Sequence, residues 1–87
     1  MNSRQAFEAI ENKIAADPEK RIVDSFYDNE HFGNFWITYD QAGDRLSVVN
    51  DRSQLFLHSG PPDQHCLTML VKHLESADEQ AILDVVP

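Results

Sequence analysis

The sequence predicts one α+β domain of two layers, in which an antiparallel sheet of three or four strands carries an N-terminal and a C-terminal helix mainly on one face. Residues 3–16 and 64–75 repeat apolar side chains at helical spacing, whereas residues 34–58 alternate apolar and polar side chains. A chain of 87 residues has room for one core, so residues 1–87 form a single domain.

The first predicted element is a helix over Ser3–Ala16. Phe7, Ile10 and Ile14 recur at intervals of three and four residues and form one apolar stripe. The helix ends before Pro18, because a residue that precedes proline is disfavoured in the α region.

The segment over residues 22–27 fits two structures. Ile22, Val23, Phe26 and Tyr27 have the spacing of a short helix and also the composition of a strand. Because β-branched and aromatic residues are enriched there, we expect a strand.

A β-meander follows, with strands at Asn34–Tyr39, Arg45–Val49 and Gln54–His58. The links over residues 40–44 and 50–53 suit hairpins. Gly43 can adopt a positive φ without a Cβ penalty, and Asn50 and Asp51 tolerate left-handed angles.

The C-terminal part reads as helical. Asp63 is placed to cap a helix over residues 64–75, and Ser76 with Glu79 has the spacing of a capping box. The apolar stripe of the 64–75 helix consists of Leu67, Leu70, Val71 and Leu74, and a short terminal helix would carry Ile82, Leu83 and Val86.

Alternation divides the meander into two faces. The apolar face, which we expect to receive the helices, carries Phe35, Ile37, Tyr39, Leu46, Val48, Leu55 and Leu57. The mixed face carries Trp36, Thr38, Ser47, Val49, Phe56 and His58. An open aromatic patch on the mixed face would be typical of an interface, unless the 22–27 segment, the C-terminal helix or a bend in the sheet covers it.

The chain is strongly acidic. Fifteen Asp and Glu residues against seven Lys and Arg give a formal net charge of −8, which disfavours nucleic acid and anionic membranes as partners. Residues 63–87 hold five acidic residues and one basic residue. Asp78, Glu79 and Asp84 therefore belong to a negative patch that would steer a basic partner, unless the acidity serves only solubility.

The sequence offers little for catalysis or metal binding. Cys66 is the only cysteine, so no internal disulfide forms, and with no signal or membrane-spanning pattern we expect a cytoplasmic protein. His65, Cys66 and His73 lie too far apart on one helix to share a zinc ion, and no glycine-rich phosphate loop is present. We expect no catalytic residue, metal or cofactor.

One acidic group lies just before the predicted meander. Asp24, Asp28, Glu30 and His31 could ligate a hard cation or provide an acid and a base. Their spacing matches no calcium loop, so a solvated acidic edge is the favoured interpretation. A lone Arg52 at the second hairpin tip makes no site by itself.

These observations favour a small non-catalytic protein-binding module. In size and charge the chain is similar to small acidic bacterial proteins that neutralise a basic toxin or nuclease, so an immunity-type inhibitor or an accessory chaperone fits. The partner-binding residues would be Trp36, Phe56 and Tyr27 as aromatic contacts, with Asp78, Glu79 and Asp84 at the charged rim. The alternative is a homodimeric structural or regulatory module, joined through the aromatic faces or the sheet edges.

Overall fold

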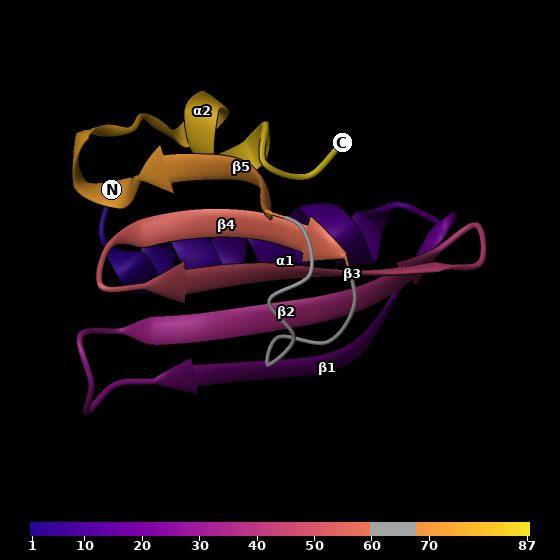
Figure 1. Ribbon diagram of the computed structural model, residues 1–87, viewed down its shortest axis with the longest axis horizontal. Helices are drawn as coiled ribbons and strands as arrows, with labels where there is room; N and C mark the ends of the chain where they lie inside the picture. The colour runs from indigo at the N-terminus through magenta and orange to yellow at the C-terminus, as the bar shows by residue number, and fades with distance from the viewer. Residues whose placement is uncertain (60–67) are drawn as a thin grey trace.

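The computed structural model describes residues 1–59 and 68–87 and shows the predicted α+β domain (Figure 1). The described elements follow the order α1 (Ser3–Ala16), β1 (Lys20–Asp28), β2 (Asn34–Gln41), β3 (Asp44–Asp51), β4 (Gln54–Ser59), β5 (Thr68–His73), a 3-10 turn η1 (Leu74–Ser76) and α2 (Glu79–Leu83).

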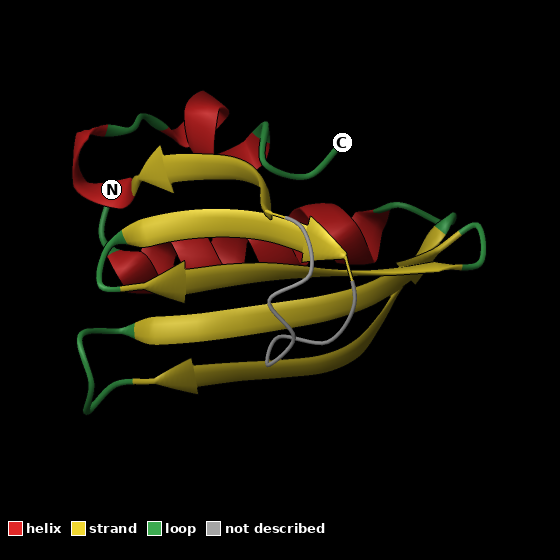
Figure 2. Cartoon of the chain, viewed as in Figure 1, coloured by secondary structure: helices red, strands yellow, loops and turns green. Residues whose placement is uncertain are grey.

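The strands form one antiparallel sheet in the order β1-β2-β3-β4-β5, so each strand pairs with its neighbour in sequence. Helix α1 crosses behind the sheet in the view of Figure 2, and the short α2 lies beyond β5. The described helices therefore leave the other sheet face without a helical layer.

Helix α1 has the bounds that the sequence predicts, because both of its ends are capped. The Asn2 side chain accepts a hydrogen bond from the backbone N–H of Gln5 at 2.8 Å, and the Gln5 side chain accepts one from the N–H of Asn2 at 3.1 Å. At the other end, the backbone N–H of Asp17 donates to the carbonyl of Ile14 at 3.1 Å, and Lys20 Nζ donates to Asp17 Oδ2 at 2.6 Å. This contact fixes the step from α1 into β1.

The hydrophobic core lies between α1, the C-terminal segment and one face of the sheet. Its buried members are Ala6, Phe7, Ile10, Ile14, Phe35, Ile37, Tyr39, Val48, Leu55, Leu57, Leu74, Ile82, Val85 and Val86. Leu46 is partly buried against this cluster. The division of the meander into an apolar and a mixed face is thus confirmed.

The segment over residues 22–27 is a strand, as expected, and it contains a β-bulge between Ile22 and Asp24. Ile22 pairs with Tyr39 and Ser25 pairs with Ile37, so residues three apart face the same side. Ile22 and Phe26, whose spacing of four residues also fits a helix, therefore lie on opposite faces of the strand, since Phe26 pairs with Trp36.

The predicted helix over residues 64–75 is wrong for the residues that the structure describes. Residues 68–73 form β5, in which Leu70 pairs with Leu57 and Val71 with Phe56. Leu74 then starts the 3-10 turn and is buried. Pairing with β4 outweighed the helical spacing, because the run contains β-branched residues and satisfies the backbone of β4. Residues 64–67 lie outside the described residues.

The short terminal helix exists but starts later than predicted. Asp78, and not Ser76, caps α2 by accepting a hydrogen bond from the N–H of Ala81 at 2.8 Å. Lys13 Nζ on α1 donates to the carbonyls of Leu83 and Val86 at 2.7 and 2.8 Å, which ties the C-terminal segment to α1. No helix within the described ranges is long and apolar enough to cross a bilayer.

The tight turns use positive φ angles. Gly43 has φ +85°, as predicted, and Ala42 beside it has φ +52°. In the second hairpin the left-handed residues are Arg52 and Ser53, at φ +52° and +67°, and not Asn50 and Asp51. Asn50 and Asp51 remain in β3, where Asn50 pairs with Phe35 on β2 and Asp51 pairs with Gln54 on β4.

Candidate functional site

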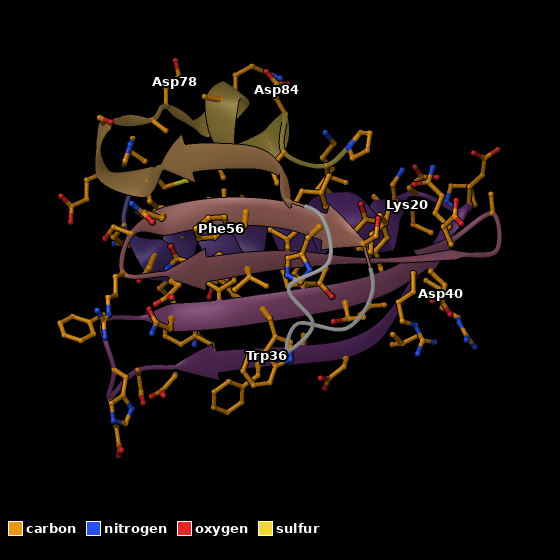
Figure 3. All side chains as sticks on the ribbon, viewed as in Figure 1. Lys20, Trp36, Asp40, Phe56, Asp78 and Asp84 are labelled. Atoms are coloured by element: carbon orange, nitrogen blue, oxygen red, sulfur yellow. The ribbon has the colours of Figure 1, made fainter. Side chains whose placement is uncertain are left out.

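The sheet face opposite α1 carries a continuous apolar row. Phe26, Trp36, Val49 and Phe56 pair in register across β1, β2, β3 and β4, so their side chains share one face. Figure 3 labels Trp36 and Phe56 on this face, turned away from α1. We call these four residues the aromatic row.

The outer end of the aromatic row is a stacked pair of rings. The ring centroids of Phe26 and Trp36 are 4.7 Å apart with an interplanar angle of 27°. Phe26 is 45% exposed, and Trp36 is half-buried. The indole Nε1–H donates to Asp24 Oδ2 at 2.8 Å, which satisfies the one polar atom of the Trp36 side chain and fixes its ring.

A polar row lies beside the aromatic row. Asp24, Thr38, Ser47 and His58 pair in register across the same four strands. Thr38, Ser47 and His58 are buried, and the Thr38 and Ser47 hydroxyls are 2.8 Å apart. His58 Nδ1 has no hydrogen-bond partner among the described residues. On β2, β3 and β4 the polar row is therefore buried and the aromatic row half-buried, and both rows become exposed on β1, at Asp24 and Phe26.

Tyr27 does not belong to this surface. It pairs with Phe35 on the core face, and its ring centroid lies 5.4 Å from that of Phe7 on α1. Its hydroxyl is 3.0 Å from Ser3 Oγ, and the Arg4 guanidinium lies 4.8 Å from its ring centroid. Tyr27 thus joins β1 to the start of α1.

The predicted acidic residues gather around α2, apart from the aromatic row (Figure 3). Asp78 caps the helix and Glu79 occupies its first turn, while Asp84 Oδ1 accepts a hydrogen bond from Gln80 at 2.8 Å. All three are exposed. They can contribute long-range attraction, but the structure does not bring them together with Trp36 and Phe56 in one contact surface.

Phe26 is the residue that sequence reasoning missed. Its segment was ambiguous between helix and strand, so no face could be assigned to it. The signal that would have placed it is the pairing of Phe26 with Trp36, which depends on the length of the loop between β1 and β2. Val23, at 36% exposed, and Phe32, at 76% exposed, are further uncovered apolar side chains outside the aromatic row.

In the acidic group before the meander, one carboxylate lies in contact with the imidazole of His31. Asp28 Oδ2 lies 2.8 Å from His31 Nδ1. The backbone N–H of Glu30 lowers the pKa of the Asp28 carboxyl, with a further contribution from His31. Within residues 1–59 and 68–87 no three His, Cys, Asp or Glu side chains converge to hold a metal ion. Cys66 and His65 lie outside the described residues.

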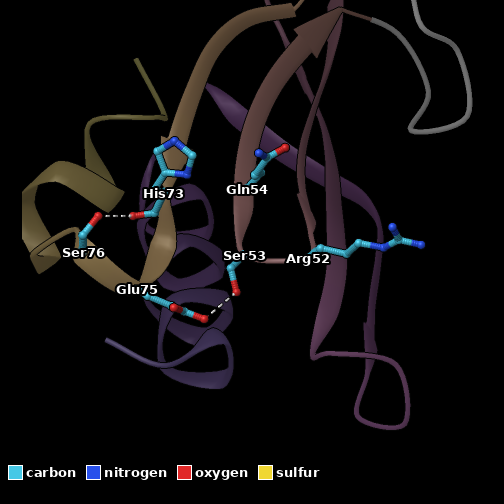
Figure 4. A pocket seen from close by; sticks show the side chains of 6 residues that line it. All are labelled: Arg52, Ser53, Gln54, His73, Glu75 and Ser76. Atoms are coloured by element: carbon cyan, nitrogen blue, oxygen red, sulfur yellow. Dashed lines mark hydrogen bonds between the residues drawn. The ribbon is translucent and has the colours of Figure 1, made fainter.

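A hollow of about 340 Å³ lies where the β3–β4 turn meets η1 (Figure 4). Its walls come from Arg52, Ser53, Gln54, His73, Glu75 and Ser76. Ser53 Oγ donates to Glu75 Oε1 at 3.1 Å, and Ser76 Oγ donates to the carbonyl of His73. The Arg52 side chain points away from the other five in Figure 4, so the hollow has no set of groups converging on a ligand.

No family model, curated protein or solved structure matches this chain. The aromatic row and the charges around it are therefore the features of this chain that bear on its function.

Proposed function

We propose that this protein is a non-catalytic cytoplasmic binding module, which uses the aromatic row to hold a basic protein partner. The observation that supports this most directly is the stacked pair of Phe26 and Trp36, which lies at the open end of an apolar row that crosses four strands. An immunity-type inhibitor or an accessory chaperone fits this description.

The aromatic row has the composition of a binding surface. Aromatic side chains dominate the energetics of protein interfaces, and they do so when a partner excludes water from them. Phe26 leaves nearly half of its surface exposed, although its stacking on Trp36 orders it in advance. A partner that covers the pair gains apolar burial with little additional loss of side-chain freedom.

The charges around the row favour a basic partner. Asp24 and Asp28 flank Phe26 on the same face of β1, and the formal net charge of the chain is −8. The exposed carboxylates of α2 add to the negative field at longer range. Such a field raises the association rate with a cationic protein and makes that rate sensitive to salt.

The test starts from a comparison of two exposed phenylalanines. The Phe26→Ser and Phe32→Ser variants and the unchanged protein are used to capture partners from a cell extract, and a protein retained by the unchanged chain is then purified. Its dissociation constant is measured by calorimetry with all three. Phe26→Ser should weaken binding about tenfold or more, because it removes an aromatic anchor, whereas Phe32→Ser should have little effect. Equal affinities for the unchanged protein and Phe26→Ser would contradict the proposal.

A second copy of the chain is the competing occupant of the aromatic row. Sedimentation equilibrium over a wide concentration range, with Trp36 fluorescence and iodide quenching on the same samples, distinguishes the two. A monomer with quenchable Trp36 agrees with a separate partner. A dimer with protected Trp36 that dissociates in Phe26→Ser would assign the surface to self-association.

A further inference from the structure

Strand β1 is an edge of the sheet (Figure 1). An edge strand presents alternate backbone N–H and C=O groups that no neighbouring strand satisfies. In β1 these groups lie next to the most exposed part of the aromatic row, because Phe26 belongs to this strand.

The bulge divides β1 into two parts of different character. Between Ile22 and Asp24 the pairing register shifts, which breaks the regular edge. From Asp24 to Asp28 each residue pairs in unbroken register with β2. This regular part spans five residues, close to the usual length of a strand.

Side chains along the regular part alternate acid, aromatic and acid on one face. Asp24, Phe26 and Asp28 share the face of the aromatic row, since they pair with Thr38, Trp36 and Asn34. The acids lie two positions on either side of Phe26, which is the spacing of successive side chains on one face of a strand.

The two carboxylates also lack strong cationic partners. Asp24 accepts the indole N–H of Trp36, and Asp28 contacts His31 and the N–H of Glu30. Within the described ranges no Lys or Arg pairs with either of them. By contrast, Asp17 pairs with Lys20 and Asp40 with Arg45.

We propose that the edge of β1 over Asp24–Asp28 takes up an extended segment of a protein partner as an additional antiparallel strand, with an apolar side chain beside Phe26 and Lys or Arg beside Asp24 and Asp28. This inference rests on the proposed function and names the part of the partner that is bound. Backbone hydrogen bonds hold the segment, and the alternating side chains select it. Opposite charges directly across neighbouring strands add to the stability of the pair.

The probe is a synthetic peptide of about seven residues in which Lys, Leu and Lys alternate with Thr. Amide NMR spectra of the full chain, recorded during titration with this peptide, should shift most over residues 24–28. Hydrogen exchange of the outward amides in that segment should slow. A peptide with Glu in place of both Lys residues serves as the charge control and should not bind.

Backbone pairing is tested with two N-methylated versions of the Lys peptide, each methylated at every second amide, in opposite phase. A strand uses one edge to pair, so one version should bind like the parent and the other should fail. The Asp24→Asn, Asp28→Asn double variant should bind the parent peptide about two- to thirty-fold more weakly at low salt. The matched control, Asp44→Asn with Asp51→Asn, changes the charge equally on β3 and should bind like the unchanged protein.

Several results would overturn the edge inference. Equal binding of both methylated peptides, shifts centred on Trp36 and Phe56 without protection of β1, or no response to the Lys peptide would each do so. None of these removes the proposed function, which depends on the loss of a captured partner in Phe26→Ser. If Phe26→Ser binds the captured partner as tightly as the unchanged protein does, both the proposed function and the edge inference are wrong.

Discussion

At the residue scale, Tyr39 shows how a buried polar group shapes stability. Its side chain is fully buried, and its hydroxyl has no hydrogen-bond partner among the described residues. Burial raises the pKa of Tyr39 to about 12, because the phenolate is disfavoured in the core. In the unfolded chain the phenol ionises near pH 10.

The Tyr39→Phe variant should therefore be as stable as the unchanged protein or more stable, by up to about 1 kcal/mol in the free energy of unfolding. Since the folded state holds the proton more tightly, the unchanged protein should lose stability as the pH rises from about 10 towards 12. The variant should lack this component. Urea unfolding at neutral and alkaline pH measures both effects. A large loss of stability in Tyr39→Phe would mean that the hydroxyl has a partner.

At the element scale, the turns show the difference between strain and crowding. Gly33 and Gly43 both have positive φ, yet a Cβ on Gly43 would have no atom within 4 Å, whereas one on Gly33 would lie 2.9 Å from the Tyr27 hydroxyl and closer still to Ser3 Oγ. A side chain at position 43 would therefore cost backbone strain alone, whereas one at position 33 would cost backbone strain and a steric clash.

We expect Gly43→Ala to lower the free energy of unfolding by about 1 kcal/mol and Gly33→Ala to lower it by more. Ala42→Asn should raise it slightly, because asparagine tolerates the left-handed φ of that position. Thermal melts of the three variants test the order. If Gly33→Ala cost no more than Gly43→Ala, the Ser3 and Tyr27 side chains would have to move aside freely.

The link between α1 and the C-terminal segment is a second element-scale feature. Lys13→Met removes the ammonium that Leu83 and Val86 use to satisfy their carbonyls, while it keeps most of the side-chain length. We expect a loss of about 1.5–3 kcal/mol, the usual value of hydrogen bonds to a charged group. Arg21→Met is the matched control, because its side chain is 77% exposed and its ion pair with Asp40 is long, at 3.5 Å. Comparable losses in the two variants would show that the contacts of Lys13 with the two carbonyls add nothing to the free energy of unfolding beyond an exposed ion pair.

At the scale of the whole molecule, the net charge opposes the compact state. A formal charge of −8 on 87 residues produces repulsion that salt screens. Thermal melts at pH 7 should therefore show a higher melting temperature with added salt, and the effect should shrink near the isoelectric point of about 4.7. A melting temperature that falls with salt at pH 7 would mean that attractive ion pairs outweigh the repulsion.

Acid lowers the stability of the folded state by protonating three aspartates, although it also reduces the net negative charge. Hydrogen bonds from the Lys20 side chain, the Glu30 backbone and the Arg45 side chain lower the pKa of Asp17, Asp28 and Asp40 respectively. Because each pKa is lower in the folded state, the stabilisation is complete above the usual value of 3.8 and is lost as the pH falls below it. Urea titrations should place the steep loss of stability below pH 4, and Asp40→Asn should reduce its slope. An unchanged slope would remove Asp40 from this account.

The parts of the fold that the sequence predicts are those specified by local patterns. The capping residues and apolar stripe determine α1, and alternation with turn residues determines β2, β3 and β4. Strand β5 was missed because Leu70, Val71 and Leu74 fit a helix, and only pairing with a distant strand decides otherwise. Local alternation also assigns Trp36 and Phe56 to one face of the sheet. The face of Phe26 and the edge position of β1 depend on pairing with β2, which no local pattern gives.

The strand order bears on how the chain folds as it is synthesised. Each described strand after β1 pairs with the described strand made before it, so the sheet can grow by adding one hairpin at a time as the chain leaves the ribosome. The apolar side of that growing sheet stays partly uncovered until Val85 and Val86 have been made, because these two residues follow the strands in the chain and are only 1% and 2% exposed in the folded protein. Helix α1 and the sheet are therefore made while part of the core still faces water, and packing of the segment that carries Val85 and Val86 completes the core.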